Sequence, residues 1–386
     1  MLKFIAPLAL LATTACSHVE DSAAITSSAE PPAHVDALAR ELVVQENIGG
    51  IGLARIEGGE VIWTGYYGEE RAGEPVGPET AFNVASVAKV LIAETVLRLV
   101  DRGAMSLDDP IHEFYRHPDL ADDPRYSQLT PRLILSHQAG LLNWPYSYED
   151  GRLAFIDEPG NGEVHYSGAA IQMLARYLEA RFEAPYPEIV DRELLDPLGI
   201  TGIAPTREAW LEGRVSDPVD GEGRTWVPFT NDPSGAMIEV GAVNAADNAY
   251  ATVPAFAQFL VAMLDGGGLS AELQLERQRF LSSSDSELGY VCVAEADACP
   301  EPLGYALGWG LFGEPGRTVL NHGGNDFAEH AQVWFIPETD EGFVMFVNGG
   351  SAFADGLRIV EAVDPDLRMA KHYRALFDMM AAQQGE

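Results

Sequence analysis

Apolar residues recur at helical spacing in the stretch that follows Ala81, and this stretch organises the rest of the chain. The spacing that predicts a helix here is that of Leu91, Val96, Leu97 and Val100. Gly103 follows where a left-handed C-terminal cap would fall, and Asn83 or Ser86 can cap the beginning. Ser86 is therefore expected in the first turn of the helix.

Alternation of apolar and polar positions predicts strands at both ends of the chain. Residues 51–67 alternate and are interrupted by Glu-Gly-Gly-Glu at 57–60, which is typical of a hairpin. Near the other end the pattern predicts further strands at Leu307–Phe312, Thr318–Asn321, Glu329–Ile336 and Gly342–Asn348. Distant segments are therefore expected to share one sheet.

Helical spacing dominates the middle of the chain. The predicted helices are Pro131–Leu135, Ala169–Arg181, Tyr186–Leu195 and Val253–Leu264, and a last amphipathic helix covers about Pro365–Ala382. We expect an α/β fold of the α+β type, with an antiparallel sheet from the N- and C-terminal segments flanked by helices and an inserted, mainly helical subdomain. The cleft between the two parts is the default site.

At 386 residues, 47% of them hydrophobic, the chain can bury a large core as one large domain or two. We expect a single catalytic domain over residues 37–386. Its α/β part comprises residues 37–106 and 262–386, and residues 107–261 form the helical insertion. Residues 17–36 have the Ser and Pro content of a poorly ordered linker.

Residues 1–16 have the pattern of an export signal. Lys3 precedes an apolar core, Phe4–Ala12, which is too short to span a bilayer as a permanent helix. Ala15-Cys16 resembles a bacterial lipoprotein processing site at which Cys16 would be acylated, although Thr13 stands where leucine is usual. Lipidation and plain secretory cleavage are the two alternatives, and both place the protein in the periplasm.

The formal net charge of −35, from 24 Lys and Arg against 59 Asp and Glu, argues against nucleic acid or anionic membrane surfaces as partners. The acidic residues are scattered, so solubility or a saline habitat accounts for them as well as function does. Apart from Cys16, Cys292 and Cys299 are the cysteines of the chain. In an oxidising compartment they can close a small disulfide, and the alternative is two free thiols.

Ser86 and Lys89 lie one helical turn apart, so the lysine amine can reach the serine hydroxyl. The chain has three lysines, at positions 3, 89 and 371, and otherwise uses arginine for positive charge. A desolvated lysine can lose its proton near neutral pH, whereas arginine cannot, so a base or proton shuttle requires lysine. The alternative is a helix cap beside a lysine that merely extends toward solvent.

Two further segments can join this pair. Tyr166 lies at a loop-to-helix junction, where a neighbouring Lys ammonium would lower its pKa toward that of a useful base. In the segment His322-Gly323-Gly324-Asn325, the glycines would allow a ligand close to the backbone and leave N–H groups to bind an oxyanion. Taken alone, Tyr166 is more often a packing residue and such a glycine pair more often a turn.

An ordered set of short motifs extends over most of the chain: Ser86-Val-Ala-Lys89, Ser136-His137-Gln-Ala-Gly-Leu, Pro159-Gly160, Tyr166-Ser167-Gly168, Asp196-Pro-Leu-Gly-Ile, Gly308-Trp-Gly and His322-Gly-Gly. This set resembles the serine β-lactamase and penicillin-binding-protein superfamily. Within it the chain is most similar to the class C β-lactamase-like serine hydrolases, which include esterases and D-amino-acid peptidases. Of the superfamily motifs S-x-x-K, S-D-N and K-T-G, only the first is present.

The resemblance implies roles for three side chains. Ser86 would be the acylated nucleophile, Lys89 its proton partner, and Tyr166 the group that takes the serine proton and passes it to the leaving group. The mechanism would be two-step acyl transfer, in which water releases the acyl-enzyme. His137 looks structural and would support the floor of the site.

The substrate-binding positions depart from the family pattern. His322-Gly323-Gly324 takes the place of Lys-Thr-Gly, and the N–H group of Asn325 would complete an oxyanion hole with that of the nucleophile. Where class C β-lactamases have an asparagine that holds the β-lactam side chain, this chain has Gly168. Both departures weaken the case for a β-lactamase and favour esters, amides or another acyl compound.

Other chemistries fit less well. The chain has no G-x-S-x-G elbow and no Walker or Rossmann glycine pattern. His112-Glu113 and His117 have the wrong spacing for a zinc protease, and we expect neither metal nor cofactor. The predicted function is a serine hydrolase for a small-molecule or peptide acyl substrate, with carboxylesterase ahead of D-amino-acid peptidase and β-lactamase. The alternative is an envelope binding or sensor protein that keeps the fold without turnover; the sequence does not indicate an oligomeric state.

Overall fold

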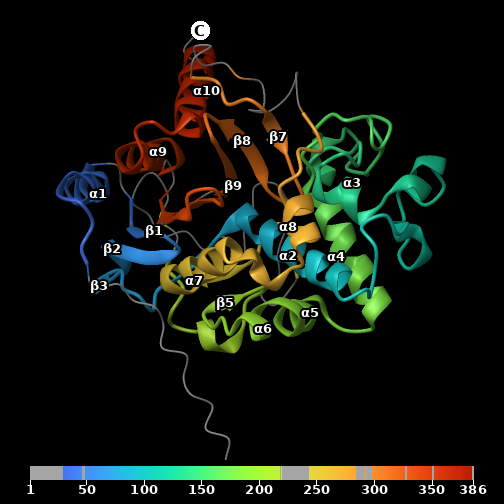
Figure 1. Cartoon of the computed structure of the whole chain (residues 1–386), viewed down its shortest axis with the longest axis horizontal. Coiled ribbons are helices and arrows are strands. Elements are labelled where there is room, and N and C mark those ends of the chain that lie inside the picture. Colours follow the sequence, from blue (N-terminus) through green and yellow to red (C-terminus); the bar gives the residue numbers. More distant parts are fainter. Residues whose placement is uncertain are drawn as a thin grey trace, which may run out of the picture.

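The computed structural model describes residues 29–45, 48–217, 219, 243–283, 292, 298–326, 328–349 and 352–384 (Figure 1). The expected export signal and Cys16 lie outside these residues. The linker expected for residues 17–36 lies partly inside them, and there it needs correction. Helix α1 (Ala33–Gln45) begins within it, because Val35, Ala39 and Leu42 form an apolar stripe that is fully buried.

One sheet joins the two ends of the chain. Its order is β3-β2-β1-β11-β10-β9-β8-β7, and every neighbouring pair is antiparallel. The strands are β1 (Gly50–Glu57), β2 (Glu60–Arg71), β3 (Glu74–Pro75), β7 (Leu303–Tyr305), β8 (Gly310–Glu314), β9 (Arg317–Asn325), β10 (Glu329–Ile336) and β11 (Glu341–Asn348). The predicted hairpin is the β1–β2 turn, and β1 pairs with β11, so the expected α+β sheet from distant segments is confirmed.

The two faces of the sheet are covered by different helices. Side chains alternate along β10, so that Val333 and Phe335 join one core while Trp334 and Ile336 join the other. The second core also contains buried residues of α1, α9 (Ala352–Val363) and α10 (Arg368–Gln384). Figure 1 shows these three helices on the opposite side of the sheet from α2 (Ala88–Asp101) and α7 (Val253–Leu264).

The middle of the chain is mainly helical, as expected. The predicted helices Pro131–Leu135 and Val253–Leu264 match α3 and α7 residue for residue. The predicted helix Ala169–Arg181 corresponds to α4 (Gly168–Phe182). Between them and beyond lie short segments: η2 (Ile111–Glu113), η3 (Pro124–Gln128), η4 (Pro145–Ser147), α5 (Tyr186–Val190), a π-helical turn (Asp191–Leu195), α6 (Asp196–Leu198), η6 (Ala209–Leu211), η7 (Gly266–Gly268) and α8 (Ala271–Arg277). A small sheet, β4-β6-β5, is formed by β4 (Ala81–Asn83), β6 (Tyr250–Thr252) and β5 (Ile203–Ala204).

Some elements were not predicted. Strand β7 is only three residues long, and its middle residue is Gly304, which weakens an alternation signal. Helix α9 contains Gly356, which lowers helix propensity, but a side chain there would meet the Met345 methyl group at 2.8 Å. The glycine therefore lets α9 approach the sheet, and packing rather than propensity decides that this segment is helical.

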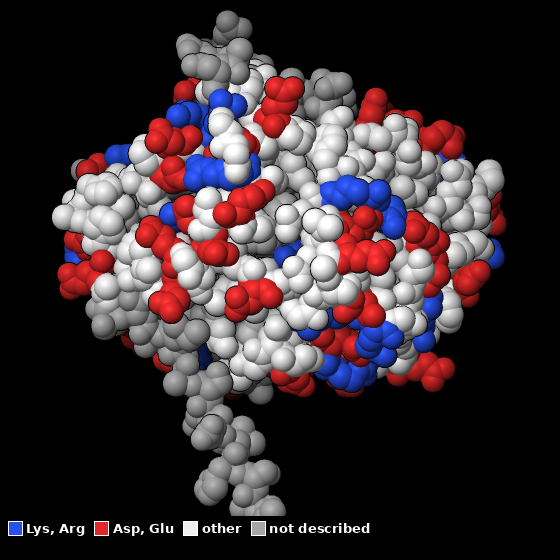
Figure 2. All heavy atoms as spheres, in the orientation of Figure 1, with Lys and Arg blue, Asp and Glu red and all other residues white. Residues whose placement is uncertain are grey.

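A disulfide joins Cys292 to Cys299, with their Cα atoms 5.7 Å apart. On the face shown in Figure 2, Asp and Glu side chains are scattered over many elements and do not gather in a single patch. Among the described residues, no helix combines the length and the apolar character that a membrane span requires.

Candidate active site

A strained turn presents Ser86 at the beginning of α2. Ser86 lies in a 3₁₀ turn (Ala85–Val87), and Ala85 before it has a φ of +46°, in the left-handed region that L-residues with a side chain rarely adopt. The Asn83 side chain accepts a hydrogen bond of 3.0 Å from the Ala85 N–H and so holds this turn. Asn83 therefore fixes the backbone before the serine, whereas neither Asn83 nor Ser86 caps α2, as had been expected of one of them.

Strand β9 lies directly against this turn at Gly324. A Cβ atom on Gly324 would be 2.3 Å from the Val84 carbonyl oxygen and 3.2 Å from the Ser86 nitrogen. Only glycine leaves room for such an approach. The predicted oxyanion-hole strand thus runs beside the backbone of the predicted nucleophile.

Lys89 reaches Ser86 from within the core. Its Nζ donates to Ser86 Oγ at 2.8 Å and to the Ala246 carbonyl oxygen at 2.6 Å, and the residue is 1% exposed. Burial lowers the pKa of Lys89 to about 8, although the negative charge of Asp247 opposes this. A neutral amine is therefore accessible at mildly alkaline pH, beside a hydroxyl that can give up its proton.

Tyr166 completes the group. The Ser86 side chain lies near enough to the phenol to oppose the rise in its pKa, and the Lys89 ammonium lies 4.9 Å from the centre of the ring. The prediction that Lys89 would lower the pKa of Tyr166 was wrong. Burial raises the pKa of Tyr166 well above its ordinary value, and the nearby Asp247 charge adds to this. The phenol is therefore protonated at neutral pH, which suits a proton donor or relay better than a resting base.

His137 packs beneath the tyrosine. The two ring centres are 4.3 Å apart, and His137 has a φ of +55° and is 1% exposed. Its Nδ1 accepts from the Ser167 N–H at 3.2 Å, and its carbonyl oxygen accepts from the His165 N–H at 2.7 Å. Burial, with the Lys89 charge nearby, keeps the pKa of His137 well below its usual value. A neutral imidazole therefore fixes the segment that carries Tyr166.

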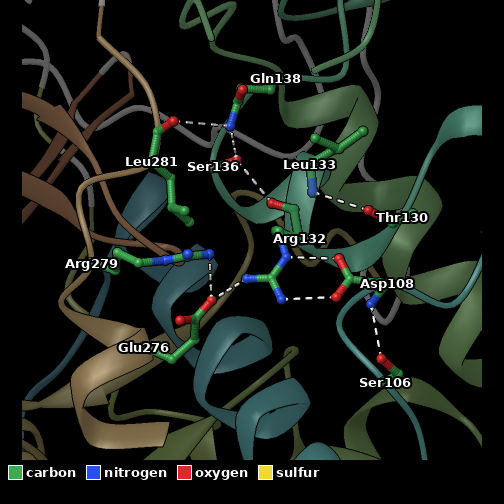
Figure 3. A network of polar contacts seen from close by, with 10 residues as sticks. All are labelled: Ser106, Asp108, Thr130, Arg132, Leu133, Ser136, Gln138, Glu276, Arg279 and Leu281. Atoms are coloured by element: carbon green, nitrogen blue, oxygen red, sulfur yellow. Dashed lines mark hydrogen bonds and ion pairs between the residues drawn. The ribbon is translucent and has the colours of Figure 1, made fainter. Parts of the chain in front are cut away.

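A polar network between α3 and α8 lies next to the segment that contains His137 (Figure 3). Arg132 donates to both carboxylate oxygens of Asp108, at 2.7 and 2.9 Å, and pairs with Glu276 of α8. Gln138, next to His137, donates to the Leu281 carbonyl oxygen at 3.4 Å. The helical insertion is thus tied to the chain that returns toward the sheet.

His322 does not supply the positive charge that a lysine would. It is 2% exposed, and burial together with the Lys89 charge lowers its pKa to about 3. Its Nδ1 lies 2.8 Å from the Gly323 carbonyl oxygen, which requires the proton on Nδ1, and its Nε2 has no hydrogen-bond partner among the described residues. A neutral acceptor therefore stands where the family pattern has a cation.

Further residues near the site were not found from the sequence. Asp247 lies in a loop without a recognisable motif, yet its charge acts on Lys89, Tyr166 and Glu329. Glu329 is 4% exposed, and burial with the neighbouring Asp247 and Asp326 charges raises its pKa well above the usual range. The sequence signal for Glu329 was a carboxylate at the beginning of a predicted strand whose second half, residues 333–336, is apolar.

The donor atoms of Asp157, Glu163 and His165 lie within 4.8 Å of one another and could hold a metal ion. The Asp157 carboxylate already accepts hydrogen bonds from Asn161 at 2.5 Å and from His165 at 3.2 Å, and Glu163 is exposed. These contacts account for the cluster without an ion.

The sequence pattern of the family described as Beta-lactamase matches residues 35–363. The chain belongs to the beta-lactamase family. Its relatives include the D-alanyl-D-alanine-carboxypeptidase/endopeptidase AmpH of Escherichia coli, which is 24% identical over 43% of this chain and 48% of its own length. Esterase EstB of Burkholderia gladioli is 37% identical over 22% of this chain and 23% of its own. The chain thus matches about half of AmpH and about a quarter of EstB.

Solved structures of this family share the fold. D-amino acid amidase from Ochrobactrum anthropi has a TM-score of 0.66, with 20% identity, over 88% of this chain and 98% of the amidase. The resemblance stated from the sequence motifs is therefore confirmed at the level of family and fold.

Proposed function

We propose that this beta-lactamase-family protein is a serine hydrolase that cleaves esters or amides through an acyl-enzyme on Ser86. The observation that carries the proposal is the position of one hydroxyl beside two proton-transfer groups. Lys89 Nζ lies 2.8 Å from Ser86 Oγ, and the Tyr166 phenol lies near enough for the Ser86 side chain to act on its pKa. The serine itself is partly exposed, so a substrate can reach it.

The proton path follows from the two pKa values. Neutral Lys89, whose pKa is lowered to about 8, takes the Ser86 proton as the oxygen attacks the carbonyl carbon. Tyr166, whose pKa is raised, gives its proton to the leaving group and is reprotonated from the Lys89 ammonium. In the second step water attacks the acyl-enzyme, and its proton returns by the same groups to Ser86.

The oxyanion hole would consist of the backbone N–H groups of Ser86 and Asn325. The close approach of Gly324 to the Ser86 nitrogen supports this pairing, since Asn325 follows directly on β9. Two backbone donors fixed by a strand and a strained turn would stabilise the tetrahedral intermediate without reorganising.

Among acyl substrates we place esters first, then D-amino-acid peptides or amides, then β-lactams. His322 is neutral and Asp247 is acidic, so a substrate carboxylate gains little beside Ser86. Gly168 has no amide with which to hold a β-lactam side chain. A neutral ester needs neither feature.

Intact-mass spectrometry with a fluorophosphonate and with p-nitrophenyl acetate tests the proposal. We expect a stable adduct with the first probe, rapid release of p-nitrophenolate with the second, and loss of both in Ser86→Ala. Ser127→Ala, at an exposed serine, is the matched control and should behave like the parent protein. Absence of any adduct overturns the proposal, and an acetyl adduct that never hydrolyses favours the binding or sensor protein instead.

We further propose export by residues 1–16 and a lipid anchor at Cys16. Metabolic labelling with a palmitate analogue tests this, with Cys16→Ser as the unlabelled control. Label that persists in Cys16→Ser would contradict the anchor.

A further inference from the structure

Gly168 and the indole of Trp144 occupy adjoining space beside Tyr166. A Cβ atom on Gly168 would lie 2.5, 2.7 and 2.9 Å from three atoms of the Trp144 ring. These distances are far below van der Waals contact. Position 168 therefore lacks a side chain because the indole already fills the volume in which one would lie.

The loop that carries the indole is held by hydrogen bonds to the segment around Gly168. Asn143, directly before it, accepts a hydrogen bond of 2.8 Å from the Gly168 N–H with its side chain and one of 2.9 Å from the Ala169 N–H with its carbonyl oxygen. The Ser167 hydroxyl donates to the Leu142 carbonyl oxygen at 2.9 Å. The loop that carries Trp144 is thus bonded residue by residue to the segment that follows Tyr166.

The indole also remains available to a ligand. Gly168 is buried, whereas Trp144 is partly exposed, so the residue that covers the glycine also reaches the surface. An indole offers a flat apolar surface and no carbonyl oxygen. It replaces the polar amide expected at position 168 in a β-lactamase by an aromatic surface.

We propose that Trp144 forms the wall of the subsite for the acyl group and selects substrates with a flat, apolar acyl group. Acylamino side chains are disfavoured, because position 168 carries no amide and the indole fills the space for one. This role of Trp144 rests on the proposed acylation of Ser86, since an acyl group can contact the indole only when it is bound at that serine. The substrate class it names is esters of aryl-bearing carboxylic acids.

The test compares two esters with the same leaving group, p-nitrophenyl phenylacetate and p-nitrophenyl acetate. In Trp144→Ala we expect the ratio of their kcat/KM values to fall about 10-fold, and in Trp144→Phe to remain within about twofold of the parent ratio. Because both esters see the same population of folded enzyme, the ratio does not depend on any loss of stability. An unchanged ratio in Trp144→Ala overturns the proposal, as does a change that follows the leaving group in a series of acetate esters.

A second pair of variants tests whether a side chain at position 168 and the Trp144 indole compete for the same space. Gly168→Asn should lower the melting temperature, and adding Trp144→Ala should recover most of that loss, because the indole is what the new side chain meets. Additive losses would contradict the contact. If the fluorophosphonate fails to label Ser86, the proposed function fails; if Ser86 is labelled but the ester ratio is unchanged, only the role of Trp144 fails.

Discussion

Helix α2 carries one buried basic residue, Lys89, and pairs with another, Arg277 of α8, and the two have opposite surroundings. Lys89 and Arg277 are each 1% exposed. Arg277 pairs with Glu94 of α2 at 3.4 Å, and Glu94 also accepts from the Trp309 indole N–H at 3.0 Å. Within the part of the chain that the structure describes, Lys89 has only the neutral oxygens of Ser86 and Ala246 within hydrogen-bonding distance.

The difference between Lys89 and Arg277 shows that the burial of a basic side chain can serve either structure or chemistry. A buried cation with a carboxylate partner keeps its charge and ties elements together, here α2 to α8. A buried amine with neutral partners is driven to give up its proton, which the lowered pKa of Lys89 reflects. The two groups therefore predict different consequences when each is altered.

The largest effect is expected at Lys89. Lys89→Arg should lower kcat/KM for p-nitrophenyl acetate by about 10³-fold, because arginine cannot accept the serine proton. Lys371→Arg, at an exposed lysine, is the matched control and should retain full activity. Circular dichroism checks that both variants are folded. Substantial turnover by folded Lys89→Arg would rule out its role as the base.

Disrupting the other cation should affect stability. Glu94→Gln should cost about 3–5 kcal/mol of unfolding free energy, because Arg277 is left as an unpaired buried charge. Urea unfolding measures this loss. The double variant Glu94→Gln/Arg277→Met should recover part of it, and a loss below about 1 kcal/mol in the single variant would mean that the pair is not a structural tie.

A smaller effect is expected where β9 meets the serine turn. Gly324→Ala should reduce kcat by about 10²-fold, because the added methyl group pushes β9 away from the Val84 carbonyl and distorts the oxyanion donors. Gly77→Ala is the matched control, since a Cβ atom there meets nothing within 4 Å. Equal activity of the two variants would contradict the proposed oxyanion hole.

The mildest perturbation is a change of pH. Only the neutral amine can accept the serine proton, so kcat/KM should fall about tenfold per pH unit below a pKa of about 8 and level off above it. A pH–rate profile with an uncharged ester measures this, and Tyr166→Phe should lower the whole curve without moving that limb. A flat profile between about pH 6 and 9 would show that Lys89 is not the group that titrates.

Much of this architecture could be predicted from the sequence, because local signals and tertiary demands agree. The β1–β2 hairpin, α3 and α7 follow from turn residues and from apolar spacing. The meeting of Ser86 with Lys89 requires only helical geometry. The segment containing Tyr166 was found as one of an ordered set of motifs, which together are more specific than any of them alone.

What the sequence could not give depends on how distant segments pack. The pKa of Tyr166 was misjudged because the neighbouring charge was considered without the burial that outweighs it. Asp247 lies in a loop with no pattern, and the contact of Trp144 with Gly168 joins two residues that share no motif. Helix α9 depends on a glycine that fits under a methionine of the sheet.

The pairing of β1 with β11 sets the time at which this chemistry can begin. The β1–β11 register runs from Gly50 opposite Asn348 to Ile56 opposite Gly342, so β1 can pair with β11 only after Asn348 has been synthesised. Gly324, which lies close to the Ser86 backbone, belongs to β9 of the same sheet. A growing polypeptide that carries Ser86 therefore lacks the proposed oxyanion hole until β11 has also been synthesised.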